Sequence, residues 1–253
     1  MNTQLSEAFT TGIPKLENVT ERYEFISTAR FIEDVQSFGY ILESTQSPRK
    51  GLGMHSMSFS HPTMPKIEGL DLRLLATNSH DATSAFRLHL QVGVGLCANI
   101  LVAFIPDLAA HSRIVHRGYA LDKVQAAIDA VRGRIDTMLS TIDAMRARDV
   151  TPENGAAFLS KAVELRDAKP YRIMDLQNTR HRGQESNNAW NVFNRVQESL
   201  IKGGYATIDT VINGAGVEVP YPGRKAREIT SVRDRVQTNY KLWELAVETL
   251  LKA

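Results

Sequence analysis

Hydrophobic and polar residues alternate in two neighbouring stretches of the chain, from Leu70 to Ala76 and from Phe86 to Val92. A period of two is typical of half-buried strands, because successive side chains point to opposite faces of a sheet. The polar segment 78–84 between them is typical of a turn. We therefore predict a β-hairpin with one face in the core. The other face is expected to be exposed and to carry Arg73, Arg87, His89 and Gln91.

The residues before this hairpin predict one helix and two further strands. Apolar residues spaced as on one helical face run from Thr28 to Gly39, with Thr28 as the expected N-cap and Gly39 as the stop. Residues 40–45 and 54–60 resume the strand pattern. Together with the hairpin, these strands predict an antiparallel sheet.

From Leu121 to Met145 the apolar residues are separated by alternating intervals of three and four. This heptad pattern predicts a long helix whose narrow apolar stripe contacts another helix. Thr151 and Pro152 open a second amphipathic segment, 151–165, so we expect an intramolecular helical hairpin. An intersubunit coiled coil is the alternative.

The last part of the chain predicts two more helices, over residues 186–202 and 231–250. Residues 204–227 between them are rich in glycine and proline and predict a long loop, a feature that is usually functional or mobile. The predicted fold class is α+β: an antiparallel β-sheet with helices packed on one face and a long helical hairpin. We divide the chain into a β-rich core (1–110), the helical hairpin (111–170) and the C-terminal helices with the loop (171–253), as parts of one integrated domain.

The composition indicates that the chain can bury a sizeable core, because 43% of its 253 residues are hydrophobic. Cys97 is the single cysteine and cannot form an internal disulfide, the start does not resemble a signal peptide, and no apolar run is long enough to cross a bilayer. We therefore expect a cytoplasmic protein with no membrane partner.

The net charge is only +2, so a nucleic-acid partner has to be argued from local clusters. Basic residues cluster around Arg180 and at the end of the predicted loop, where Tyr221 also lies. Cations that follow a phosphate backbone, with an aromatic ring on which bases stack, are typical of single-strand binding; an ordinary solvated surface is the alternative. The predicted nucleic-acid-binding residues are Arg87, His89, Arg180, Arg182, Tyr221, Arg224, Lys225 and Arg227.

The turn of the central hairpin contains the string Asn78-Ser79-His80-Asp81. Asn, Ser and Asp side chains bond to nearby backbone in turns, so a structural turn motif is the first interpretation, and a direct ligand or phosphate contact is the alternative. Adjacent Ser79 and His80 are poorly placed for a nucleophile and its base. The β-rich region also holds His55, His61, His80, His89, Asp81 and Cys97, whose spacings match no metal-binding pattern, so we expect no metal.

Familiar enzyme signatures do not occur in the sequence. Neither glycine pair, Gly93/Gly95 nor Gly214/Gly216, belongs to a dinucleotide fingerprint, and there is no phosphate-binding loop, H-E-x-x-H or G-x-S-x-G. We therefore expect a non-enzymatic protein without a cofactor.

The motifs Asn78-Ser79-His80-Asp81 and Cys97-Ala98-Asn99, together with the segments 190–198 and 224–246, resemble the phage and plasmid family called domain of unknown function 932. The family often carries an arginine shortly before the Cys-x-Asn step, where this chain has Gly95 and Leu96. The resemblance implies a mobile-element context among recombination and anti-restriction genes, and a distant similarity to single-strand annealing proteins.

These observations lead to one main functional hypothesis, a phage or plasmid protein that binds and anneals single-stranded DNA in recombination, as a homo-oligomer and without nucleotide hydrolysis. A protein-interaction module, such as an anti-restriction inhibitor, is the alternative. A hydrolase that uses the His80-Asp81 region is a third possibility.

Overall fold

The structure is a computed structural model, and it describes residues 24–47, 53–81, 83–94, 100–102, 112–166 and 185–252. The chain forms two compact units, residues 1–138 with 231–233 and residues 139–230 with 234–253. Within the described residues, no helix combines the length and apolar character needed to cross a membrane. The fold is mixed α+β with an antiparallel sheet, as the hydrophobic pattern predicts.

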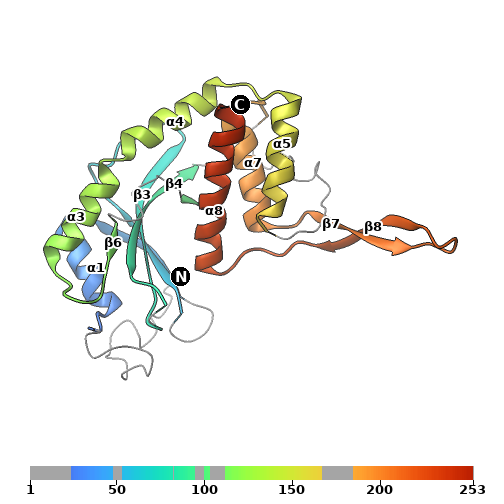
Figure 1. Ribbon diagram of the computed structural model, residues 1–253. Helices are drawn as coiled ribbons and strands as arrows, with labels where there is room; N and C mark the ends of the chain where they lie inside the picture. Colours follow the sequence, from blue (N-terminus) through green and yellow to red (C-terminus); the bar gives the residue numbers. More distant parts are fainter. Residues whose placement is uncertain are drawn as a thin grey trace. The chain divides into compact units, whose positions relative to one another are not determined.

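The sheet of the first unit follows the order β1-β2-β3-β4-β5, with every neighbouring pair antiparallel, and β6 pairs with the other end of β4 (Figure 1). The register of the central hairpin sets Leu74 opposite Leu90 and Ala76 opposite Leu88, so its apolar residues share one face. The strands are β1 (Ile41–Gln46), β2 (His55–Ser60), β3 (Leu70–Asn78), β4 (Phe86–Val94), β5 (Ile100–Val102) and β6 (Arg113–Ile114).

Helices α1 (Thr28–Ser37) and α3 (Leu121–Arg132) pack against the apolar face of the sheet. The ring of Phe31 stacks on that of Phe86, with 4.2 Å between centroids, and Gly39 ends α1 with a φ of +85°. The N-cap is Ser27, whose hydroxyl accepts a hydrogen bond from the Arg30 amide at 3.1 Å. The prediction that Thr28 caps the helix is therefore wrong by one residue, and the Thr28 hydroxyl is left for other partners.

The prediction that the second face of the sheet is exposed is wrong at its centre. His89 and Gln91 are only 4% and 3% exposed. Each has a side-chain partner on another strand of the sheet. Ser58 Oγ, on β2, donates to Gln91 Oε1 at 2.9 Å, and His89 Nε2 lies 3.0 Å from Thr77 Oγ1, on the adjacent strand β3. Cross-strand hydrogen bonds allow polar residues to be buried, so alternation alone does not establish an exposed face. Arg73 and Arg87 are intermediate in exposure.

The long heptad segment is helical almost throughout, as α3 and then α4 (Ile135–Ala147). Its apolar stripe is buried from Val124 to Met145, whereas Leu121 is exposed. The two helices meet at Gly133, whose amide bonds to the Asp129 carbonyl at 2.8 Å.

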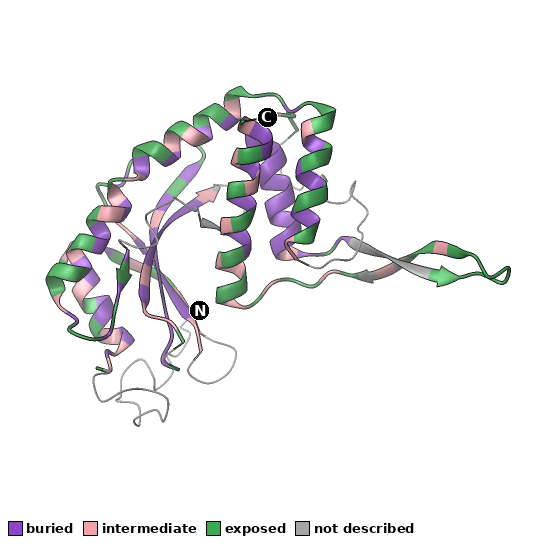
Figure 2. Ribbon diagram, in the orientation of Figure 1, coloured by how far each residue is buried: buried purple, intermediate pink, exposed green. Residues whose placement is uncertain are grey.

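In the second unit, α5 (Pro152–Glu164) finds its main partners in α7 (Ala189–Lys202) and the π-helical turn η2 (Val247–Leu251) rather than in the preceding helix. Figure 2 shows α7 buried along its length, and Phe193 on this helix contacts both tryptophan rings, Trp190 and Trp243. Both tryptophans belong to the core of this unit, since each is only 5% exposed. The last helix is α8 (Val232–Ala246).

Residues 204–227 contain a β-hairpin, β7 (Ala206–Ile212) with β8 (Glu218–Lys225), so the prediction of a long loop is wrong. Pro220 and Pro222 had argued against a strand, but each strand of a two-stranded sheet has an unpaired edge, where a missing amide proton is tolerated. The tip is held by Asn213, whose Oδ1 accepts from the amides of Ala215 and Val217 at 2.9 and 3.0 Å.

Candidate functional site

The string Asn78-Ser79-His80-Asp81 divides into two pairs with different roles. Ser79 Oγ accepts from the Ser84 amide at 2.8 Å, and Asp81 Oδ1 accepts from the Thr83 amide and hydroxyl at 3.0 and 2.6 Å. These are the contacts that the turn interpretation requires. Asn78 and His80, which are buried like Ser79, instead contact residues from elsewhere in the chain.

These residues form a histidine cluster, which we define as His55, His80, His116, Thr28 and Asn78, all in the first unit. Thr28 Oγ1 lies 2.8 Å from the Nε2 atoms of both His55 and His80, and the two imidazole rings are 4.8 Å apart. His116 Nε2 lies 3.1 Å from Asn78 Oδ1. Helix α1, strands β2 and β3, the turn and the segment after β6 therefore meet at one buried point.

His116 was absent from the sequence prediction, and its position explains why. The residue lies in an irregular segment, and only the pairing of Ile114 with Phe86 brings it beside the end of β3. Its ring then stacks on Phe86, with 5.3 Å between centroids. The remaining candidates lie apart from the cluster: His89 bonds to Thr77, and His61 to the Phe38 carbonyl at 3.2 Å.

The imidazoles of the cluster are neutral at neutral pH. Burial, together with smaller effects of the neighbouring His55 and His116, lowers the pKa of His80 to about 4, against a weaker opposing effect of Asp81. Burial also lowers the pKa of His55 and of His116. Neutral imidazole is the form that binds metals, yet the described residues contain no group of three or more His, Cys, Asp or Glu arranged to hold an ion. Cys97 lies outside the described residues.

A hydroxyl between two imidazoles has the elements of a nucleophile and its base. Thr28 is 0% exposed and His80 is 1% exposed, so a substrate has no access to either. The arrangement is therefore a buried junction between α1 and the sheet, and it does not support the hydrolase hypothesis.

The second candidate region is the β7–β8 hairpin, residues 206–225, which we call the arm. Within the described chain the arm makes its main contacts with itself, and its outer end is exposed (Figure 2). Ile212, Val217 and Tyr221 are 72%, 56% and 59% exposed, and Lys225 and the adjacent Arg227 are exposed too. Exposed apolar side chains concentrated on one element mark an interaction surface.

The predicted basic residues lie in different parts of the chain, and the structure does not describe all of them. Lys225 lies at the end of β8 and Arg227 just beyond it, and Arg224 belongs to the same strand. Arg180 and Arg182 lie outside the described residues. Arg87 is on the central sheet, away from the arm in sequence, and the buried His89 cannot contact a polymer. Tyr221, Arg224 and Lys225 therefore share one strand of the arm, and Arg227 lies just beyond it. Among the described residues of the sheet, the buried His89 interrupts the predicted basic face.

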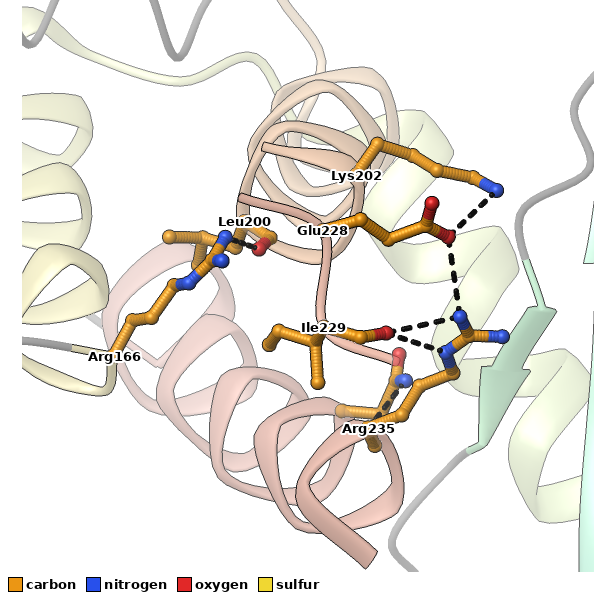
Figure 3. A network of polar contacts seen from close by, with 7 residues as sticks. Arg166, Leu200, Lys202, Glu228, Ile229 and Arg235 are labelled. Carbon is orange, nitrogen blue, oxygen red and sulfur yellow. Dashed lines mark hydrogen bonds and ion pairs between the residues drawn. The ribbon is translucent and has the colours of Figure 1, made fainter. Parts of the chain in front are cut away.

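The base of the arm is fixed to the helices of its own unit by the polar network in Figure 3. Arg235 donates to the Ile229 carbonyl at 2.9 Å and to Glu228 Oε1 at 3.2 Å, and Lys202 pairs with the same oxygen at 3.3 Å. Arg166 donates to the Leu200 carbonyl. The carboxylate of Glu228 thus pairs with both Arg235 and Lys202.

Comparison with known proteins places these features in a family. The chain is 26% identical to the UPF0380 protein YfjQ of Escherichia coli K12 over 247 residues, which cover 94% of this chain and 85% of that protein. It is also 26% identical to the UPF0380 protein YafZ of the same strain, over 246 residues and the same shares of both chains. No solved structure matches the chain. The family model described as "Domain of unknown function (DUF932)" matches residues 15–243, and the chain therefore belongs to this family.

Proposed function

We propose that the protein binds single-stranded nucleic acid with its β7–β8 arm. The observation that carries the proposal is the exposure of Tyr221 and Lys225 on the two-stranded ribbon, together with that of Arg227 just beyond its end. An exposed aromatic ring offers a surface on which unpaired bases stack, and the cations neutralise the phosphates.

The register of the ribbon distributes these groups over both of its faces. Tyr221 lies opposite Asp209, whereas Lys225 lies opposite Ala206, after an irregularity that shifts the alternation. Tyr221 and Lys225 therefore occupy different faces. A strand that crosses the edge of β8 can stack on one face and place its phosphates on the other, which a groove in a flat sheet would not allow.

The apolar tip of the arm suits a nucleic acid as well. Ile212 and Val217 flank the turn at Gly214 and Gly216. Small apolar side chains at the end of a ribbon or loop are used by DNA-binding proteins to separate stacked bases. Annealing of complementary strands needs no nucleotide hydrolysis, because base pairing supplies the free energy. The mobile-element context of the sequence resemblance supports recombination as the setting, with a homo-oligomer as the working form.

The test is fluorescence anisotropy with a labelled single-stranded oligonucleotide, and the variant is K225A/R227A. We expect at least a tenfold loss of affinity at low salt. The slope of log affinity against log salt concentration should also decrease by the release of about two counterions, because two phosphate contacts are removed. Y221A should lose affinity by about tenfold, since stacking contributes about 1–3 kcal/mol per base.

The matched control is K161A/K241A, which removes two exposed cations from helices α5 and α8. It should bind like the unmodified protein. Equal affinity of the K225A/R227A variant and this control would refute the arm as the binding element.

A second candidate function, binding of a protein partner such as a host defence enzyme, is favoured by one observation. Ile212 and Val217 present apolar surface that nucleic acid does not require for affinity. The variant I212S/V217S should leave oligonucleotide affinity within threefold if the cations carry binding. Loss of self-association by this variant in mass photometry, with oligonucleotide binding intact, would assign the tip to protein contacts.

A further inference from the structure

Three residues of the histidine cluster, His55, Thr28 and His80, form a chain of hydrogen bonds in which each proton is donated to one acceptor. His55 Nδ1 lies 3.3 Å from the Gly53 carbonyl, so this nitrogen carries the proton and donates to the oxygen. His55 Nε2 then has a lone pair and accepts from the Thr28 hydroxyl, and the hydroxyl oxygen accepts from His80 Nε2. Because the Gly53 carbonyl can only accept a hydrogen bond, the donor and the acceptor are fixed in each bond from Gly53 through His55 and Thr28 to His80.

This chain leaves His80 Nδ1 with a lone pair, and no hydrogen-bond partner for it lies among the described residues. A further proton on His80 would therefore sit on a buried nitrogen without an acceptor. A further proton on His55 would point at the Thr28 oxygen and turn the hydroxyl proton away from its acceptor. A proton on His55 therefore breaks the link to Thr28, whereas a proton on His80 leaves the Nε2 link in place but adds a buried, charged donor without an acceptor among the described residues. Both protons destabilise the closed arrangement.

The groups around His80 do not compensate a positive charge. The facing titratable groups are His55 from β2 and His116 from the segment after β6, both of which become cations on protonation, and Asp81 from the turn. Asp81 is exposed and already accepts two hydrogen bonds from Thr83. On α1, Asp34 accepts from the Tyr119 hydroxyl at 2.6 Å, and Arg30 lies over the same ring.

We propose that the His55–Thr28–His80 chain is an acid-sensitive latch, which holds the first turn of α1 on the sheet at neutral pH and releases it when the cluster takes up a proton. Thr28 is the only member of this chain on α1, and it contacts both imidazoles. Release of the first turn would uncover the contact of Phe31 with Phe86. The inference is independent of the proposed function of the arm.

The size of the effect follows from proton linkage. A histidine with a pKa of about 4 when latched and an ordinary value of 6.5 when released favours the released state by roughly 25-fold at pH 5, relative to pH 7.5. His55 and His116, whose pKa values are also lowered, act in the same direction.

The test is hydrogen–deuterium exchange of the full-length protein at pH 7.5 and pH 5, corrected for the intrinsic pH dependence of exchange. The peptide that covers α1 should lose protection by at least tenfold at pH 5, while the peptide that covers β4 keeps its protection. Loss of protection in both peptides together would mean global acid unfolding and would refute the latch. Unchanged protection of α1 would refute it as well.

The variant H80Q sharpens the result, because glutamine retains a donor near the position of Nε2 but does not titrate. Its α1 protection should change between the two pH values by less than a third of the change in the unmodified protein. H61Q is the matched control outside the cluster and should retain the full change. If H80Q does not fold, the comparison of α1 with β4 in the unmodified protein still decides the question.

Discussion

The histidine cluster and the arm both include polar segments next to turns, but the cluster is buried and the outer end of the arm is exposed. In the cluster, side chains from distant parts of the chain satisfy one another, and the residues are buried. In the arm, the ribbon pairs with itself and leaves apolar, aromatic and cationic side chains exposed. Burial with internal partners indicates a role in holding the fold, and exposure without a covering element indicates a role in binding.

The same contrast separates the predicted binding residues. His89 was assigned to an exposed basic face, but its hydrogen bond with Thr77 accompanies near-complete burial. Tyr221 was assigned to a mobile loop, but it lies on a strand and is exposed. The proposed binding role therefore rests on the arm and not on the sheet.

The base and the tip of the arm can be compared directly with two glycine substitutions. Gly203 has a φ of +70°, and a Cβ there would lie 2.5 Å from the Ala226 carbonyl oxygen. G203A should therefore destabilise the protein by about 4 kcal/mol, through left-handed backbone strain and a backbone clash. The measurement is urea unfolding.

The matched substitution is G216A at the tip. Gly216 also has a positive φ, of +74°, but a Cβ there meets nothing within 4 Å. This variant should lose only about 1 kcal/mol. Equal losses for the two variants would contradict the rigid base.

Acid should weaken the first unit through the histidine cluster. His80 has a pKa of about 4 in the folded protein and 6.5 when unfolded, so the unfolded state binds more protons between these values. Stability is therefore full above pH 6.5, falls as the pH drops, and has lost about 2–3 kcal/mol at pH 4. The measurement is urea unfolding of the H80Q variant over the same pH range. Its free energy of unfolding should fall by about 2–3 kcal/mol less than that of the unmodified protein. An equal fall in both proteins would exclude His80 as the cause.

Removal of the Thr28 hydroxyl tests the junction at neutral pH. T28V keeps the shape of the side chain but leaves two buried imidazole nitrogens without their shared partner. It should lose about 2 kcal/mol in urea unfolding, because buried polar atoms that lose a partner are costly. T28S keeps the hydroxyl and should stay within about 1 kcal/mol of the unmodified protein.

The smallest expected effect belongs to the tip of the arm. Ile212 is 72% exposed, so I212S should change the free energy of unfolding by no more than about 0.5 kcal/mol. A larger loss would show that the side chain packs against something in the folded protein, and the arm would then resemble the cluster.

Periodicity was sufficient to predict the central hairpin and the long heptad segment. The alternation in β3 and β4 and the heptad spacing of α3 and α4 agree with the strands and helices observed. Sequence could not show that Gln91 is buried, because its partner Ser58 lies on another strand. Local composition was misleading in the arm, where Pro220 and Pro222 suggested a loop although an edge strand accepts them.

The candidate site was less predictable than the fold. His80 was singled out, but its hydrogen bond is with Thr28, which lies 52 residues earlier. Asn78 in the same motif bonds to His116, which a single short strand pairing positions. The expected cap role of Thr28 concealed its real partners, because Ser27 performs the capping. Long-range contacts of this kind leave no periodic signal in a sequence.

The central claim is that the arm binds and does not stabilise. Its most direct test is a variant in which residues 207–224 are replaced by a short Asn-Gly turn between Ala206 and Lys225, compared with the unmodified protein in oligonucleotide binding and urea unfolding. The account predicts an unfolding free energy within about 1 kcal/mol of the original, because the arm packs mainly on itself, together with at least a tenfold loss of affinity for single strands. A folded variant that binds single-stranded oligonucleotide with undiminished affinity would contradict it.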